Sequence, residues 1–357
     1  MFALAVLSAG VLPLAADDLE GKLIRVTIPA LDFEDASLEE GLGFFSQRAN
    51  ELSKEPGPVN FVVEDPSGTL KEKKVKWLRL KNVPAREGLA YLLTLCGARA
   101  RFDAHAIMIL PQSNGAPAEW RSETQRNVAS VAARNREVTL SRITIPSLAF
   151  EEVSLKEGLE FFSQRASELS KGTAQLNFVV PDQESLLLKQ AKALRLKNVP
   201  LTVALRYFLA QCGCEARYDA NAIVIIPRSA AAADSRSEEQ KQLAAAAAKN
   251  REAKFAAIKM PSINFEDTPL EEAIDFLHDM LADPEHCERA NLIIEDPMNA
   301  LVGKKIKSLK LKDVPTSEVL QYIVTQCGAT VRYDEYALVI SPRGAGPKAA
   351  PKEGAPE

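Results

Sequence analysis

Hydrophobic and polar positions change their period in a fixed order from the N-terminal part of the chain onward. Ile24, Val26 and Ile28 alternate with polar residues, which predicts a half-buried strand that Pro29 closes. The apolar positions that follow recur with the period of a helix and predict one buried helical face. That face comprises Leu38, Leu42, Phe45, Ala49 and Leu52.

Two further segments complete the first part of the pattern. Residues 60–63 read as a short buried strand that ends at an acidic turn, and Leu78 and Leu80 alternate with basic residues in the next strand. Pro84 ends this strand and suits the start of a second helix, because proline has no N–H to donate to a sheet.

This order of elements is written three times. The period is too long for a solenoid repeat, so each copy must bury its own core, and we expect separate domains joined by linkers. The near-identical segments are RLKNVPAREGLAYLLTLCG (79–97), RLKNVPLTVALRYFLAQCG (195–213) and KLKDVPTSEVLQYIVTQCG (310–328).

The second helix and a closing hairpin are clearest in the middle copy. Gly213 can take the left-handed conformation that ends a helix. Residues 216–219 and 222–226 then predict a hairpin that ends at Pro227. The inward face of the helix is predicted to be Leu205, Phe208, Leu209 and Cys212.

The pattern therefore predicts an α+β fold of three tandem βαββαββ domains, with two helices over small sheets, joined by helical linkers. The linkers are Ala-rich and of high helix propensity, so we expect stiff helical spacers. The predicted ranges are a leader (1–20), the first domain (21–113), a linker (114–137), the second domain (138–229), a linker (230–253), the third domain (254–343) and a disordered tail (344–357).

Recurring polar residues are predicted to begin the first helix of each copy. Capping boxes are expected at Ser37 with Glu40 and at Ser154 with Glu157, and the Thr268 hydroxyl is expected to cap before Pro269. Paired acids precede each helix, where the helix dipole favours negative charge, so we interpret them as caps rather than as an acid–base pair. These acids are Glu34 and Asp35, Glu151 and Glu152, and Glu266 and Asp267.

Composition and charge restrict the partners. The 357 residues are 46% hydrophobic and 26% charged, and 44 Lys and Arg against 48 Asp and Glu give a net charge of −4. Such a chain has no basic field for phosphates, so nucleic acid is not an expected partner. No apolar run is long enough for a transmembrane helix.

The first sixteen residues, MFALAVLSAGVLPLAA, are apolar and precede Asp17 and Asp18, as at the end of a secretory leader. We interpret them as an export signal, which places the protein in the periplasm or cell envelope. The alternative is the first buried segment of a cytoplasmic protein.

The motifs of each copy resemble the secretin and TonB-receptor short N-terminal (STN-like) domain family. In the first copy these are SLEEGL (37–42), NFVV (60–63), LRLKNVP (78–84), CG (96–97) and RFDAHAIMI (101–109). The resemblance implies a periplasmic domain that binds neighbouring envelope proteins. The three copies come without a secretin pore or a TonB-receptor barrel, so we expect binding rather than transport.

Candidate chemistry is sparse. His105, His278 and His286 do not recur at matching positions, and a metal site around His278, Asp279, Asp283, Glu285, His286 and Cys287 is not favoured by the spacing. Cys96, Cys212 and Cys327 are predicted to be buried thiols rather than parts of a disulfide framework, whereas Cys214 and Cys287 have no clear partner. We predict no catalytic residue, no metal and no small-molecule cofactor.

An exposed apolar face is the expected binding feature. Val75 and Trp77 share the face of their strand opposite to Leu78 and Leu80, so Trp77 on the outer surface is a candidate anchor for a partner. Cover of Trp77 by the following helix, through Trp120, is the alternative that we favour. Open sheet edges could also pair with a partner.

The sequence thus predicts a non-enzymatic envelope scaffold that binds other envelope proteins or self-assembles, as an accessory to a secretion or pilus system. A cytosolic regulatory scaffold, or an enzyme with a site at a domain junction, stays open as an alternative.

Overall fold

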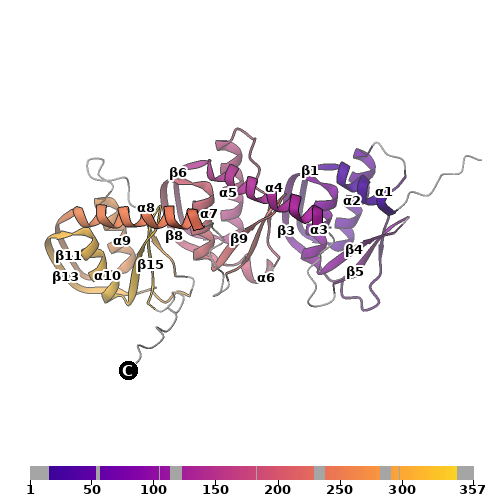
Figure 1. Ribbon diagram of the computed structural model, residues 1–357. Coiled ribbons are helices and arrows are strands. Elements are labelled where there is room, and N and C mark those ends of the chain that lie inside the picture. Colours follow the sequence, from indigo (N-terminus) through magenta and orange to yellow (C-terminus); the bar gives the residue numbers. More distant parts are fainter. Residues whose placement is uncertain are drawn as a thin grey trace, which may run out of the picture. The chain divides into compact units, whose positions relative to one another are not determined.

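The computed structural model describes residues 16–53, 57–103, 105–112, 123–181, 183–228, 238–281, 291–296 and 298–343. It confirms the α+β class (Figure 1). The chain divides into two compact units. The first comprises the residues up to Arg136 with 175–184 and 217–225, and the second comprises 137–174, 185–216 and the residues from 226 onward. The division therefore runs through the second copy.

The predicted βαββαββ order is present in each copy, and a helix precedes it each time. The first copy contains α1 (Ala16–Arg25), β1 (Thr27–Ser37), α2 (Leu38–Leu52), β2 (Phe61–Val63), β3 (Lys74–Pro84), α3 (Ala85–Cys96), β4 (Ala98–Phe102) and β5 (Ile107–Pro111). The second contains α4 (Glu123–Ser141), β6 (Thr144–Ser154), α5 (Leu155–Leu169), β7 (Phe178–Val179), α6 (Gln183–Leu186), β8 (Gln190–Pro200), α7 (Leu201–Gln211), β9 (Cys214–Tyr218) and β10 (Ile223–Pro227). The third contains α8 (Glu238–Ala257), β11 (Lys259–Pro269), α9 (Leu270–Met280), β12 (Leu292–Ile294), β13 (Lys305–Pro315), α10 (Thr316–Gln326), β14 (Ala329–Tyr333) and β15 (Leu338–Pro342).

Each copy supplies a long antiparallel ribbon and a small mixed sheet. In the first copy β1 and β3 form the ribbon, while β2 is parallel and β4 antiparallel to β5. In the third copy β11 and β13 form the ribbon, and β12 and β14 flank β15 in the same way. In the first copy, the segment that connects the two ribbon strands contains α2, and the other copies have an equivalent helix there.

Ribbons and small sheets of successive copies join into continuous sheets. The strand orders are β1-β3-β7-β10-β9 and β6-β8-β12-β15-β14, while β2-β5-β4 and β11-β13 remain as smaller sheets among the described residues. The three tandem copies therefore share sheets along the chain. The reason is that a ribbon edge offers unpaired backbone groups, and the next copy's short strand satisfies them.

One residue of each acidic pair has an unusual backbone conformation within a ribbon, which corrects the interpretation of these pairs. Asp35, Glu152 and Asp267 have positive φ values of 52°, 51° and 49°. Each lies inside a ribbon strand, and the pairing register continues unbroken on both sides of it. These acids are thus strand residues, and the caps of the following helices are Ser37, Ser154 and Pro269.

The start of the first copy differs from the prediction. Ile24 belongs to α1, which begins at Ala16 inside the predicted leader range, and Pro29 lies within β1 instead of closing a strand. Proline is accommodated there because β1 is an edge strand, where a missing N–H breaks no ladder bond. Residues 1–15 lie outside the described part.

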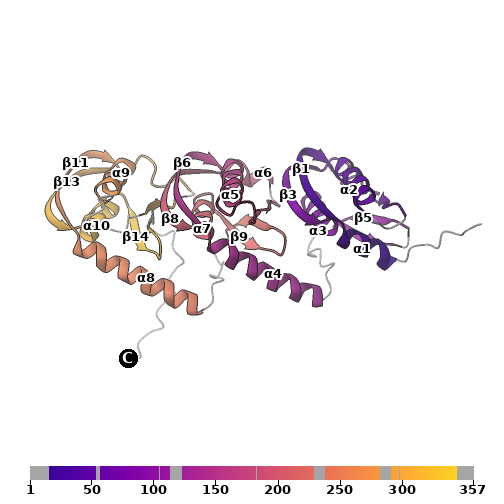
Figure 2. The ribbon, with the colours of Figure 1, turned by 90° about the horizontal axis from the view of Figure 1, so that it is seen from above.

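In the first and third copies, the helix that precedes the copy packs on it and is not a free spacer. Figure 2 shows α8 beside α10 and β14, which it contacts together with β13. In the first copy α1 contacts α3, β3 and β4 in the same way. Leu23, Leu140 and Phe255 occupy equivalent positions near the ends of these helices, and all three are buried. The helical conformation of both linkers is confirmed over 123–141 and 238–257.

Local signals in the sequence are mostly realised. Both capping boxes form, at Ser37 with Glu40 and at Ser154 with Glu157. The third cap is wrong, because Pro269 takes the cap position and the Thr268 hydroxyl donates to the Glu266 carbonyl instead.

The helix ends and the buried faces also agree with the sequence pattern. Gly97, Gly213 and Gly328, which follow the second helices, all have the positive φ values expected of helix-ending glycines. The predicted helix faces are buried apart from Leu52, which is exposed.

Candidate protein-interaction site

Val75 and Trp77, the predicted anchor residues, are 0% and 3% exposed. The exposed surface predicted around them is therefore absent. The backbone of their strand β3 is instead covered by Gln183, a residue of the second copy. The Gln183 side chain accepts from the N–H of Lys76 at 2.7 Å and donates to the Trp77 carbonyl. Trp120, the alternative cover, lies outside the described residues.

A side-chain amide fixes the register where β3 meets β7. The Asn177 amide accepts from the N–H of Lys81 at 2.8 Å and donates to the Lys81 carbonyl at 3.1 Å. One pair of residues, Arg79 and Phe178, forms the antiparallel bridge. Because Asn177 is only 2% exposed, its bonds also satisfy polar groups that water does not reach.

The same joint is built again in the second unit. Asn291 accepts from the N–H of Lys197 at 2.8 Å and donates to its carbonyl at 3.4 Å. Leu194 lies opposite Ile293, which is the register of the first joint carried over one copy. A third bond crosses here, from the Gln211 amide to the Ile294 carbonyl at 2.8 Å.

A tyrosine and an aspartate meet beside each joint. The Tyr91 hydroxyl donates to Asp219 at 3.2 Å, and the Tyr207 hydroxyl donates to Asp334 at 3.0 Å. Both tyrosines are buried. Burial, and then the carboxylate of Asp334, raise the pKa of Tyr207 above its ordinary value, so the hydroxyl keeps its proton as a donor.

An arginine of the intervening helix stands near each pair. Burial lowers the pKa of Arg136, and the charges of Tyr91 and Asp219 partly offset this effect. In the second unit the equivalent Arg251 donates to the Glu335 carbonyl at 3.0 Å. The joint is therefore a strand pairing, an amide clamp and a small buried polar cluster.

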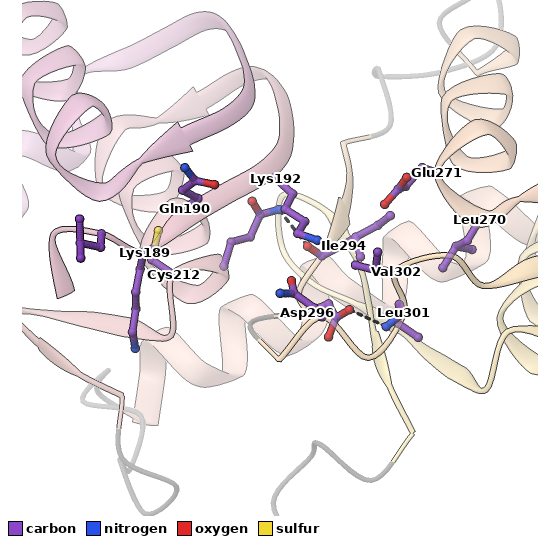
Figure 3. A pocket seen from close by; sticks show the side chains of 13 residues that line it. Lys189, Gln190, Lys192, Cys212, Leu270, Glu271, Ile294, Asp296, Leu301 and Val302 are labelled. Atoms are coloured by element: carbon purple, nitrogen blue, oxygen red, sulfur yellow. Dashed lines mark hydrogen bonds between the residues drawn. The ribbon is translucent and has the colours of Figure 1, made fainter. Parts of the chain in front are cut away.

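A cavity of about 330 Å³ opens beside the second joint (Figure 3). Its charged lining consists of Lys189, Lys192, Glu271 and Asp296. Cys212 also lines it, and burial raises the pKa of this thiol to about 12, so it is protonated and a poor nucleophile at neutral pH. Leu188, Gln190, Gln211, Leu270, Ile294, Asn299, Leu301 and Val302 complete the lining.

The acids and the histidine that the sequence offered as candidate chemical groups have structural roles in the described part of the chain. Glu151 and Glu266 form ion pairs with Arg195 and Lys310 on the neighbouring strand. His278 is buried on α9, and burial followed by the charge of Lys197 lowers its pKa. The described residues contain no group of His, Cys, Asp and Glu side chains that could hold a metal. The remaining residues of the metal site considered from the sequence (Asp283, Glu285, His286 and Cys287) lie outside the described residues.

The cysteines behave as predicted. Cys96, Cys212, Cys214 and Cys327 are buried free thiols in the described part of the chain. Desolvation raises the pKa of each one, and that of Cys96 reaches about 11.

Sequence reasoning missed the residues that build the joints. Asn60, Asn177 and Asn291 recur before the short strands, and Tyr91, Tyr207 and Tyr322 recur on the second helices. The recurring asparagine at the start of each short buried strand could have indicated the joints, because a buried polar side chain needs a hydrogen-bond partner.

Comparison of the chain with known protein families, with curated proteins and with solved structures found no match. Within the described ranges, no helix combines the length and the apolar character that crossing a bilayer requires.

Proposed function

We propose that the chain is a non-enzymatic scaffold that binds proteins of the bacterial cell envelope through three secretin N-terminal-like domains. The observation that supports it is the joint, in which the open edge of a ribbon accepts a short strand of another copy. The same joint occurs twice with the same register and the same asparagine clamp. A mode of docking that one chain uses repeatedly is suited to neighbouring proteins with similar edges.

The chemistry of the joint favours binding over catalysis. Its bonds are made by backbone groups, amides and a protonated tyrosine, which fix register and orientation. The second copy binds on both sides, because its β7 segment meets the first copy and its β8 meets the third. A chain of such joints holds several proteins in fixed order, as an accessory of a secretion or pilus system requires.

Location in the envelope rests on the sequence. The apolar stretch before Asp17 and the resemblance of each copy to periplasmic domains both support export. N-terminal sequencing of the protein from its native cells tests this part, since an exported chain is expected to begin near Asp17. A chain that retains Met1 in the cytoplasm would favour the cytosolic scaffold instead.

An enzyme with a site at a domain junction is the second candidate, and the cavity beside the second joint is the observation that favours it. Lys192 and Glu271 are the charged groups through which it would act. Replacing both by Ala is expected to leave partner binding intact. Loss of a measurable turnover in this variant would favour the enzyme.

Site-specific photo-crosslinking in native cells tests the scaffold. A photoreactive residue is placed at Val63 or Tyr322, on the outer edges of the first and third copies, and at Val131 on the exposed face of α4 as a control. Discrete cross-linked proteins at the first two positions, and none at Val131, are expected. Equal cross-linking at all three positions, or none, would contradict the scaffold.

A further inference from the structure

The two smaller sheets correspond to the two parts that each five-stranded sheet combines. Each five-stranded sheet contains a two-stranded ribbon and a three-stranded sheet from successive copies. Among the described residues, the ribbon β11-β13 pairs with no small sheet, and the small sheet β2-β5-β4 pairs with no ribbon. The chain therefore carries one unused half at its third copy and the complementary half at its first.

Apolar side chains whose equivalents are buried in the joints are exposed on these unused halves. Val62 and Val63 of β2 are each 45% exposed, whereas their equivalents Val179 and Val180 are 1% and 0% exposed. Tyr322 on α10 is 47% exposed, although the equivalent tyrosines of the other copies are buried in the joints. Exposed apolar side chains on a sheet edge favour pairing with another strand.

The clamp residue is already in place on the free small sheet. In the joints, the Asn177 and Asn291 amides each donate to a hairpin carbonyl of their own copy, at 2.9 Å and 2.8 Å. Asn60 makes the equivalent contact, with its amide 3.5 Å from the His105 carbonyl. Its position relative to β2 is therefore that of the two working clamps, and the residue it would meet is Lys312.

The unused halves also carry opposite charges at the positions where the second joint has an ion pair. In the second joint, Arg228 forms an ion pair with Glu295. The equivalent residues of the unused halves are Arg343 and Glu64, both exposed and of opposite charge. Tyr322 has the matching acceptor too, because Asp103 occupies the position of Asp219 in the hairpin.

The free edge of β13 carries a side chain that satisfies it in the absence of a neighbour. Gln326 accepts from the N–H of Lys307 at 3.2 Å and donates to the Ser308 carbonyl at 3.1 Å. These backbone groups are the equivalents of those that Gln183 covers in the first joint. The equivalent of Gln326 in the second joint, Gln211, reaches across to the docked strand. Gln326 therefore binds backbone groups of β13 whose equivalents are bound by a residue of the docked copy in the first joint.

We infer that a second copy of this chain docks the β2 edge of its first copy onto β13, with the register and the clamp of the internal joints. Leu309 then lies opposite Val62, the Asn60 amide meets Lys312, and Tyr322 donates to Asp103. This inference rests on the proposed scaffold function and names the partner of its two outer edges. The contact is head-to-tail, so it builds a ring or a filament according to the rotation between successive copies.

The proposed joint between two chains differs from the internal joints in one residue, and this difference affects its strength. Arg136 and Arg251 stand beside the internal tyrosine–aspartate pairs, but the equivalent residue in the first copy is Leu19. The joint between chains lacks this cation and is made between separate molecules. Association is therefore expected to be reversible and to depend on concentration.

Sedimentation velocity of the full chain over a dilution series tests the inference. The unmodified chain is expected to sediment faster as concentration rises. Val63→Lys and Tyr322→Glu, which block opposite halves, are each expected to weaken association by about tenfold or more. Because both residues are exposed in the single chain, the variants are expected to fold normally. Val131→Lys and Val128→Glu, on the exposed face of α4, are the matched controls and are expected to associate like the unmodified chain.

Mixing the two blocked variants distinguishes this joint from other contacts. Each retains one working half, so the mixture is expected to form a dimer that grows no further. Glu64→Arg and Arg343→Glu are each expected to weaken association, and the chain carrying both is expected to recover it. Association of the unmodified chain that persists unchanged in Val63→Lys and Tyr322→Glu would overturn the inference.

A monomer at every concentration would also overturn the inference. The scaffold function would survive that result if cross-links from Val63 or Tyr322 lead to a different protein. If no cross-linked protein forms either, both proposals fail.

Discussion

The edges formed by β2 and β7 have nearly the same sequence and opposite environments. NFVV is identical at 60–63 and 177–180, yet the valines are half-exposed in the first segment and buried in the second. The segments differ in what their backbone meets, since β7 pairs with β3 and β2 pairs only with β5 in the described part. Burial of an edge strand is thus a property of the joint and not of the strand.

The comparison also separates the residues that stabilise the joint from those that fix its register. Burying a valine contributes about 1.5–3 kcal/mol and depends little on register. The asparagine clamp and the tyrosine–aspartate bond are directional, so they select one register out of several that the apolar strands would permit. Substitutions at equivalent positions of a buried and a free edge separate these contributions.

The largest difference is expected when a charge is placed on the edge. Val179→Lys is expected to lower the free energy of unfolding by more than about 4 kcal/mol, because a buried ammonium without a partner is strongly unfavourable. Val62→Lys, at the equivalent exposed position, is expected to change it by less than about 0.5 kcal/mol. Urea unfolding followed by circular dichroism measures both.

The measurement is made at low protein concentration, where contact between chains does not contribute. Val131→Lys provides the baseline for adding a lysine to an exposed site. Similar destabilisation by Val179→Lys and Val62→Lys would show that the two edges share one environment, contrary to the structure.

Removing the clamp is expected to have a smaller effect. Asn291→Ala leaves the N–H and carbonyl of Lys197 without their partner and is expected to cost about 1–3 kcal/mol. Asn60→Ala, whose side chain is exposed, is expected to cost less than about 0.5 kcal/mol. Hydrogen exchange adds a local readout, because the Lys197 amide is expected to lose protection in Asn291→Ala. Unchanged protection of that amide would mean that the clamp does not hold the joint.

Local signals in the sequence predicted most of each copy. Alternation and helical period predicted the strands and helices, and Pro84 with Gly97 predicted where the second helix begins and ends. Such signals act within a few residues, so they do not depend on the rest of the chain. The buried thiol of Cys96 followed from the same helical period.

The joints could not be predicted in this way. The acids Glu34 and Asp35 fit the start of a helix as well as the end of a strand, and only the pairing partner on β3 decides between them. The apolar face of Trp77 was recognised, but its cover comes from a segment a whole copy away. Asn177 carries a signal only when its partner strand is known.

The smallest effect is expected from one hydroxyl and depends on pH. Tyr207→Phe removes the bond to Asp334 and is expected to cost about 1 kcal/mol at neutral pH. Burial and Asp334 raise the pKa of Tyr207, so near pH 10, where an unfolded tyrosine loses its proton, the folded chain keeps it. The contribution of Tyr207 to stability is therefore full below about pH 10 and falls as the pH rises further. The difference between Tyr207→Phe and the unmodified chain should narrow over that range, whereas Tyr322→Phe, at an exposed position, should differ little from it at neutral pH. Unfolding in urea at a series of alkaline pH values measures this, and a difference that stays constant with pH would mean that the Tyr207 hydroxyl titrates alike in the folded and unfolded chain.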